Sequence, residues 1–238
     1  MNSIPTPSVI LLDIEGTTLP VSFVHKVLFP YARKALPDLI RDRANDPAVI
    51  AALAETKRLS PDREPLAQLM AWMDEDAKVG PLKALQGIAW ADGYASGALI
   101  ADLFPDVPPA LRTWSDAGLT LAVYSSGSAP AQRLIYTHTT DGDLTSLFSA
   151  FLDLEMGGKK DAESYRRILS KMGWKASDVL FVSDVVAELD AATAAGLRTC
   201  QMVRPEDGTV AGTVHPVAHS MKEVAGLFSL PEPVGKAQ

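Results

Sequence analysis

The sequence predicts an α/β fold, a doubly wound parallel sheet with an inserted all-helical cap. Three observations predict it: short apolar runs that end in polar loops, a regular alternation of such runs with helical segments in the second half of the chain, and a preceding block with helical periodicity throughout. In such sheets ligands bind beyond the carboxyl ends of the strands, so the loops that follow the apolar runs are the places to look for functional residues.

The first strand is expected at Val9–Leu12, where four apolar residues follow one another without a polar break. This pattern is typical of a central parallel strand that is covered on both faces. The run stops at Asp13, and residues 13–18 are expected to form a loop.

Residues from about 21 to 104 are expected to be helical, because apolar side chains recur at intervals of three and four. Four prolines fit the first turn of a helix, where a backbone N–H is not needed: Pro47, Pro61, Pro65 and Pro81. The sequence therefore predicts a helical cap over 20–104, inserted into an α/β core domain that is formed by 1–19 and 105–238.

Strands and helices are expected to alternate after the cap. The sequence predicts strands at 119–124, 151–152, 179–182 and 198–203, and helices from about 129, over 162–172 and over 187–195. Asp161 is a suitable N-cap for the second of these helices, and Gly196 is a suitable C-cap for the third.

Composition and charge exclude several classes of protein. The 238 residues are 47% hydrophobic and 21% charged, which is typical of a globular protein and not of a disordered chain. The formal net charge is −7, so neither nucleic acid nor an anionic membrane is an expected partner. The single cysteine, Cys200, excludes an internal disulfide. Residues 1–8 do not have the pattern of a secretory signal, and a cytoplasmic location is expected.

Acidic residues follow two of the expected strands. Asp13 comes directly after the first strand, with Glu15 two residues later, and Asp184 follows the run 179–182. A carboxylate at Asp13 could attack phosphorus and form an aspartyl-phosphate. Because neighbouring parallel strands end at the same edge, Asp184 is expected near Asp13, and Mg²⁺ is the cation that suits two such carboxylates. Glu188 fits equally well as a further ligand of this ion or as an acid in the first turn of a helix.

Two further loops carry groups that bind phosphate. Ser125 and Ser126 precede a helix whose free N–H groups could join their hydroxyls around an anion, although an ordinary N-cap explains the same residues. Lys159 or Lys160 supplies a positive charge after two glycines, unless the pair is solvated in a turn. Together, an acid pair, a serine loop, a lysine loop and a second acid meet the requirements of phosphoryl transfer.

Other common chemistries lack their sequence patterns. The chain has no Gly-x-Ser-x-Gly elbow for acyl transfer and no glycine-rich loop for a dinucleotide or a nucleoside triphosphate. The histidines do not have the spacing of metal ligands: His25, His138, His215 and His219.

The four loops resemble those of the haloacid dehalogenase-like superfamily of phosphatases with an aspartate nucleophile. Within it, residues Asp13 to Thr18 together with Tyr124 to Ser128 are similar to the enolase-phosphatase (acireductone synthase) family of methionine salvage. The resemblance implies a monomeric, Mg²⁺-dependent enzyme that acts on a small phosphorylated diketone, 2,3-diketo-5-methylthiopentyl-1-phosphate. The substrate is enolised, and the enol phosphate is then hydrolysed to the acireductone and phosphate.

The resemblance also implies roles for individual residues. Asp13 would be the nucleophile and a metal ligand. Glu15 would be the general acid and base, and its backbone carbonyl would bind Mg²⁺. Asp184 would be the second metal carboxylate. The phosphate would be held by Ser125, Ser126 and Lys159.

Three other interpretations fit part of the pattern. A related phosphatase for another small substrate, such as phosphoglycolate, would share every catalytic residue. A receiver-like signalling domain also stores an aspartyl-phosphate, but the helical insert and Glu15 favour an enzyme. A catalytically inactive binding module is disfavoured by the intact Asp13, Lys159 and Asp184. For the enolisation, Glu15 is the one base that the sequence suggests.

Overall fold

The computed structural model describes residues 6–234. The chain divides into two compact units, one formed by the described residues up to Val21 and from Ala101 onward, the other by Ser22–Ile100. The assignment of 1–19 and 105–238 to a catalytic domain and of 20–104 to a cap stays a prediction, because compactness alone does not show what each part does.

The first unit is built on one parallel sheet, and the predicted doubly wound α/β fold is confirmed. Within the described residues the sheet has six strands in the order β3-β2-β1-β4-β5-β6, all parallel. Their bounds are β1 (Val9–Leu12), β2 (Thr120–Tyr124), β3 (Phe148–Leu152), β4 (Val179–Ser183), β5 (Arg198–Met202) and β6 (Val217–Ala218). The first strand of the chain is thus central, with β2 on one side and β4 on the other.

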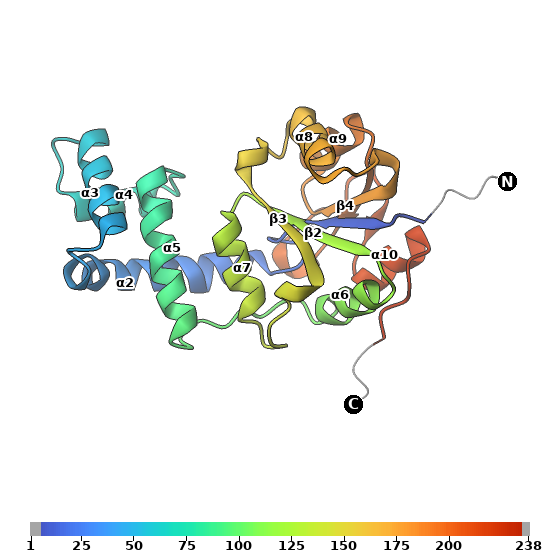
Figure 1. Ribbon diagram of the computed structural model, residues 1–238, viewed down its shortest axis with the longest axis horizontal. Coiled ribbons are helices and arrows are strands. Elements are labelled where there is room, and N and C mark those ends of the chain that lie inside the picture. Colours follow the sequence, from blue (N-terminus) through green and yellow to red (C-terminus); the bar gives the residue numbers. More distant parts are fainter. Residues whose placement is uncertain (1–5, 235–238) are drawn as a thin grey trace. The chain divides into compact units, whose positions relative to one another are not determined.

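Helices cover both faces of this sheet, with α8 and α9 on one face and α6 and α10 on the other (Figure 1). The helices of the unit are α6 (Val107–Asp116), α7 (Ala129–Thr137), α8 (Ala162–Met172), α9 (Val186–Ala194) and α10 (Met221–Phe228). Short 3₁₀ helices are η2 (Thr145–Leu147), η3 (Leu154–Met156), η4 (Ala176–Asp178) and η5 (Pro205–Asp207). The side chain of Asp161 caps α8 by accepting a hydrogen bond from Glu163 N at 3.0 Å, as the sequence predicts.

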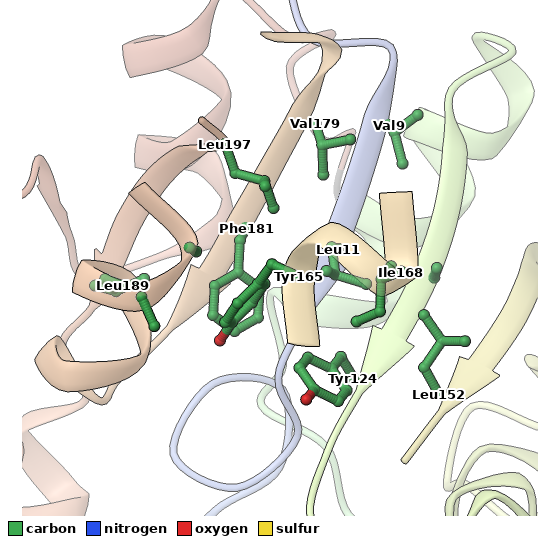
Figure 2. Packing of buried hydrophobic residues seen from close by; sticks show 13 residues of the cluster. Val9, Leu11, Tyr124, Leu152, Tyr165, Ile168, Val179, Phe181, Leu189 and Leu197 are labelled. Atoms are coloured by element: carbon green, nitrogen blue, oxygen red, sulfur yellow. The ribbon is translucent and has the colours of Figure 1, made fainter. Parts of the chain in front are cut away.

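The core under α8 and α9 consists of side chains from one face of the sheet. Val9 and Leu11 alternate in β1 and point to this face, where Tyr165 and Ile168 of α8 pack on them (Figure 2). Tyr165 and Phe181 are fully buried here. This alternation is what a strand with a two-residue side-chain period produces, and it leaves Ile10 and Leu12 for the opposite face.

The second unit is all-helical, as the sequence predicts for this part of the chain. Its elements, with α1 beginning one residue before it, are α1 (Val21–Phe23), the π-helix η1 (Val24–Leu28), α2 (Phe29–Asp42), α3 (Pro47–Leu59), α4 (Pro65–Asp74) and α5 (Gly80–Ala95). Pro47, Pro65 and Pro81 lie in first turns, as expected. The expectation for Pro61 is wrong, because that residue lies in the turn between α3 and α4.

A helix crosses a bilayer only if it is long and predominantly apolar. None within residues 6–234 combines the length and the apolar character needed to cross a bilayer.

Candidate active site

Three of the predicted site loops leave the sheet side by side. In the register of the sheet, Leu12 pairs with Val123 of β2 and with Val182 of β4. Asp13, which follows Leu12, is therefore flanked by the ends of both neighbouring strands, and its backbone N–H donates to Val182 O at 3.0 Å. Ser125 comes one residue beyond β2 and Asp184 one residue beyond β4. The topology thus places these residues at one edge, as the strand-end argument predicts.

A buried ion pair joins the loop after β1 to the segment between η3 and α8, which contains Lys159 and is called the lysine loop. Lys159 Nζ lies 2.6 Å from Asp13 Oδ1 and 2.6 Å from Glu188 Oε2. The side chains of Lys159 and Asp13 are each 7% exposed, and that of Glu188 is 10% exposed. Lys160, the neighbouring candidate, is exposed to solvent. The structure therefore favours Lys159 as the lysine of the site.

The hydroxyl of Ser183 connects the same two carboxylates. Ser183 Oγ donates to Glu188 Oε2 at 2.9 Å, lies 3.3 Å from Asp13 Oδ2, and accepts a hydrogen bond from Val185 N at 3.2 Å. Since Ser183 is fully buried at the end of β4, these contacts hold both acids in fixed orientations.

The loop after β1 folds into a tight turn that presents Glu15 to solvent. The N–H groups of Thr17, Thr18 and Leu19 all point to the carbonyl of Ile14, at 2.8 to 3.1 Å. The Thr18 hydroxyl donates to the carbonyl of Asp13 at 3.1 Å. Asp13 is buried whereas Glu15 is exposed, so the two acids experience different environments although they are two residues apart.

Gly16 allows this turn to approach Asp184. Its φ of +72° lies in the left-handed region, and a Cβ atom at this position would be 2.6 Å from Asp184 Oδ2. A side chain would therefore be both strained and in collision with the carboxylate. The close approach places Asp184 directly beside the Asp13–Thr18 turn.

The serine loop is fastened at its base. Ser125 is buried, and its Oγ accepts from Gly127 N at 3.3 Å. The amide Nε2 of Gln132 donates to the carbonyls of Gly127 and Leu152, both at 2.8 Å, and ties the loop to the end of β3. Ser126, in the same loop, is half-buried. Both predicted serines thus lie one and two residues beyond β2, just before α7.

The charges of the site shift the pKa values of its acids. Burial and the negative charges of Asp13 and Glu188 raise the pKa of Asp184 to about 7. Burial and the charge of Asp13 likewise raise the pKa of Glu188. Burial alone would lower the pKa of Lys159, but the charges of Asp13 and Glu188 outweigh it and raise that pKa. The ammonium therefore stays charged, and the acids compete for too little positive charge.

This imbalance fits a divalent cation. Asp13, Glu188 and Asp184 bring three carboxylates to one ammonium, so two negative charges remain when all are ionised. Residues 6–234 contain no group of three or more His, Cys, Asp or Glu side chains arranged around a metal position. Mg²⁺ does not need one, because it is commonly held by one or two carboxylates together with water and phosphate oxygens. The donor set of Asp13 and Asp184 therefore fits this ion.

Some residues of the site have only weak signals in the sequence. Glu188 has two equally good explanations, and the structure shows it paired with Lys159. The roles of Ser183 and Gln132 were not predicted, because each is a single polar residue in a strand or a helix and belongs to no recognisable motif. A polar residue that ends an otherwise apolar strand, as Ser183 does, is the signal that could have found it.

Comparisons with known proteins show the family of the chain. Residues 7–196 match the family model described as haloacid dehalogenase-like hydrolase. An enolase-phosphatase E1 of Gluconacetobacter diazotrophicus is 66% identical over 93% of this chain and 94% of that protein. The chain belongs to the enolase-phosphatase family of haloacid dehalogenase-like hydrolases.

Further enolase-phosphatases and one solved structure extend this relationship. An enolase-phosphatase E1 of Acidiphilium cryptum is 53% identical over 95% of this chain and 98% of that protein. The crystal structure of the UTR4 protein of Saccharomyces cerevisiae has a TM-score of 0.77 and 34% identity, and covers 90% of this chain and 98% of that one. Enolase-phosphatases and their superfamily are generally metal-dependent, in agreement with the excess of carboxylates.

Proposed function

We propose that this enolase-phosphatase converts 2,3-diketo-5-methylthiopentyl-1-phosphate to the acireductone 1,2-dihydroxy-3-keto-5-methylthiopentene and phosphate, within L-methionine salvage. The observation that carries the phosphatase half is the buried contact of 2.6 Å between Asp13 and Lys159 at the end of the central strand. It supports the assignment of Asp13 as the nucleophile, because a phosphate bound there would meet the positive charge that it requires.

In the hydrolytic step, Asp13 attacks phosphorus and Glu15 acts on protons. A carboxylate oxygen of Asp13 forms a bond to phosphorus while the bond to the enol oxygen breaks, which leaves an aspartyl-phosphate. Glu15 gives its proton to the departing oxygen and then takes one from the water that hydrolyses the aspartyl-phosphate. Its exposed position in the turn after β1 supports this role, because the side chain can meet both substrate and water.

The phosphoryl group is held by Ser125, Ser126 and Lys159. The two serines follow β2 in the loop beside the end of β1, where Asp13 lies. The expected help from the first N–H groups of α7 is wrong, because Ala129 N donates to Asp153 Oδ2 and Ala131 N donates to the capping Ser128 Oγ. Lys159 comes from the segment between β3 and α8 and neutralises the oxygens that gain charge during transfer. Glu188 has no direct part in this proposal: it holds Lys159 in place through its contact of 2.6 Å.

Asp13, Asp184 and the backbone carbonyl of Glu15 would hold Mg²⁺. When bound, the ion supplies charge neutralisation for the phosphoryl group and polarises the substrate carbonyl. For the enolisation, Glu15 removes the proton from the carbon beside that carbonyl and returns it to the carbonyl oxygen, which becomes the enol hydroxyl. The excess of carboxylates over ammonium groups supports the metal assignment.

The remaining parts of the proposal concern the state of the protein in the cell. A monomer in the cytoplasm suits a small metabolite as substrate and the acidic surface implied by a net charge of −7. Sedimentation velocity at several protein concentrations tests the monomer, and a rise in apparent mass with concentration would contradict it.

One cuvette tests the two half-reactions together. The diketo phosphate is added with Mg²⁺, and the ultraviolet absorbance of the enol is followed beside released phosphate. A rise in absorbance accompanied by phosphate supports both steps. If phosphate were released from phosphoglycolate but not from the diketo phosphate, the proposed substrate would be wrong, and Asp13 would still be the proposed nucleophile. The matched blank is Asp13→Asn, in which phosphate release should stop.

A further inference from the structure

We infer that Tyr165 is a positioning residue for Lys159, and that its hydroxyl acts through the backbone carbonyl of that lysine. The inference rests on the proposed role of Lys159 in holding phosphate, and it assigns a function to a side chain that otherwise belongs to the core. Tyr165 lies on α8 and is fully buried.

Two tyrosine hydroxyls of the core donate hydrogen bonds to the backbone of the lysine loop. The Tyr165 hydroxyl donates to Lys159 O at 2.7 Å, and the Tyr124 hydroxyl donates to Gly157 O at 2.8 Å. Figure 2 shows both hydroxyls at the same end of the core cluster, away from Val9 and Val179. Two carbonyls that are two residues apart are therefore held by donors from β2 and from α8.

The loop packs closely on α8 beside these hydrogen bonds. Gly157 has a φ of +114°, a conformation that side chains rarely adopt, and a Cβ atom there would collide with Ser164 Oγ on α8. The loop thus lies directly on the first turn of α8. A buried carbonyl without its donor is costly, so removal of the Tyr165 hydroxyl would favour a shifted backbone at Lys159.

Aromatic rings also surround the end of the lysine side chain. Lys159 Nζ lies 6.0 Å from the ring centroid of Tyr124 and 5.9 Å from that of Phe181. Tyr165 packs against both rings, with centroid distances of 5.5 Å to Tyr124 and 5.3 Å to Phe181. The rings offer a weak attraction to the ammonium but no hydrogen bond, so the Asp13 and Glu188 oxygens determine where it points. A shift of the Lys159 backbone would therefore weaken the contacts of the ammonium with these two oxygens.

The test is a double-mutant cycle between Tyr165→Phe and Lys159→Met. Phosphate release from p-nitrophenyl phosphate is measured with Mg²⁺ for the wild type, both single variants and the double variant. We expect Tyr165→Phe to lower kcat/KM about tenfold in the wild type, and by less than about twofold in Lys159→Met, because the hydroxyl acts through the lysine. Ile168→Val is the matched control: it removes a methyl group from the same cluster and leaves the Tyr165 hydroxyl in place, so it should leave kcat/KM unchanged.

A binding measurement keeps the test decisive if Lys159→Met is inactive. Titration calorimetry with inorganic phosphate in the presence of Mg²⁺ should show weaker binding for Tyr165→Phe than for Ile168→Val. It should show no further weakening when Tyr165→Phe is added to Lys159→Met. An equal loss in both backgrounds, or wild-type behaviour of Tyr165→Phe, would overturn the inference.

The cycle does not depend on the natural substrate. If the wild type hydrolyses p-nitrophenyl phosphate but not the diketo phosphate, the proposed substrate fails while the role of Tyr165 is still measured. If the diketone is converted and the cycle is additive, the proposed function stands and the positioning role is wrong.

Discussion

The ammonium of Lys159 lies 2.6 Å from one oxygen of the Asp13 carboxylate, and only 7% of either side chain is exposed. In a site with so little water, the attraction between the two charges is screened less than it would be at a surface. A carboxylate is the group that attacks phosphorus, and the ammonium beside it supplies the positive charge that a phosphate requires. Burial of this contact therefore strengthens the interaction that the first step of the proposed reaction requires.

The adjacent lysines permit a matched comparison. Lys159→Met removes the buried charge and should lower kcat for phosphate release by about 10² to 10³, the range observed when a donor to a developing negative charge is lost. Lys160→Met changes an exposed side chain and should retain wild-type kcat. Steady-state kinetics decide, with circular dichroism to show that both variants fold. Equal losses in the two variants would remove the assignment of Lys159.

Asp13→Asn should abolish phosphate release, because an amide is a poor nucleophile although its shape is nearly that of the acid. The measurement is a phosphate-release assay at high enzyme concentration, together with trapping of a phosphorylated protein after an acid quench. Asp62→Asn, in the exposed turn between α3 and α4, makes the same chemical change away from the sheet and should have wild-type activity. Retained turnover in Asp13→Asn would exclude the covalent mechanism.

The sheet could be predicted from the sequence where its strands are buried on both faces. Val9–Leu12 and Val179–Ser183 are buried throughout and form runs of apolar residues that only a polar loop interrupts. At the edge the pattern fails: the first three residues of β3, from Phe148, are partly exposed, and the expected strand is too short. Helix α6 was not predicted because Pro108 and Pro109 obscure its periodicity, although both lie in its first turn.

The site follows from the sequence as far as strand ends determine it. Asp13, Ser125 and Asp184 each come directly after a buried strand, so their neighbourhood is a consequence of the topology. The contact between Lys159 and Glu188 could not be derived in this way, because it joins a loop to a helix at a distance of 29 positions in the chain. An acid in the first turn of a helix has a sufficient local explanation, and only the fold shows that Glu188 is buried.

The pKa of Asp184 predicts how pH and Mg²⁺ interact. Burial and nearby negative charge raise it to about 7 in the metal-free protein, from about 3.9 in an unfolded chain. Between these values the folded protein keeps a proton that the unfolded chain has lost, so stability should fall as pH rises through this window. Mg²⁺ replaces the proton, and should therefore raise the melting temperature more at about pH 8 than at about pH 5.5.

Thermal unfolding with and without Mg²⁺ at both pH values measures this difference. Asp184→Asn is the control, because an amide does not titrate and should reduce the pH dependence of the Mg²⁺ effect. If Mg²⁺ stabilised the wild type equally at both pH values, Asp184 would not be the group that exchanges a proton for the metal.

A comparison of Gly16→Ala with Gly118→Ala shows whether Gly16 is needed for its positive φ alone or also for the space beside Asp184. The glycines at 16 and 118 have similar φ angles, +72° and +82°, so alanine should cost a comparable strain of about 1 to 2 kcal/mol at either position. Around Gly118 no atom lies within 4 Å of an added Cβ, whereas at Gly16 that atom would be 2.6 Å from Asp184 Oδ2. We therefore expect both variants to lose stability and Gly16→Ala alone to lose affinity for Mg²⁺, measured as the Mg²⁺ concentration for half-maximal phosphate release. If Gly16→Ala kept the wild-type Mg²⁺ dependence, the turn after β1 and Asp184 would not share one metal site.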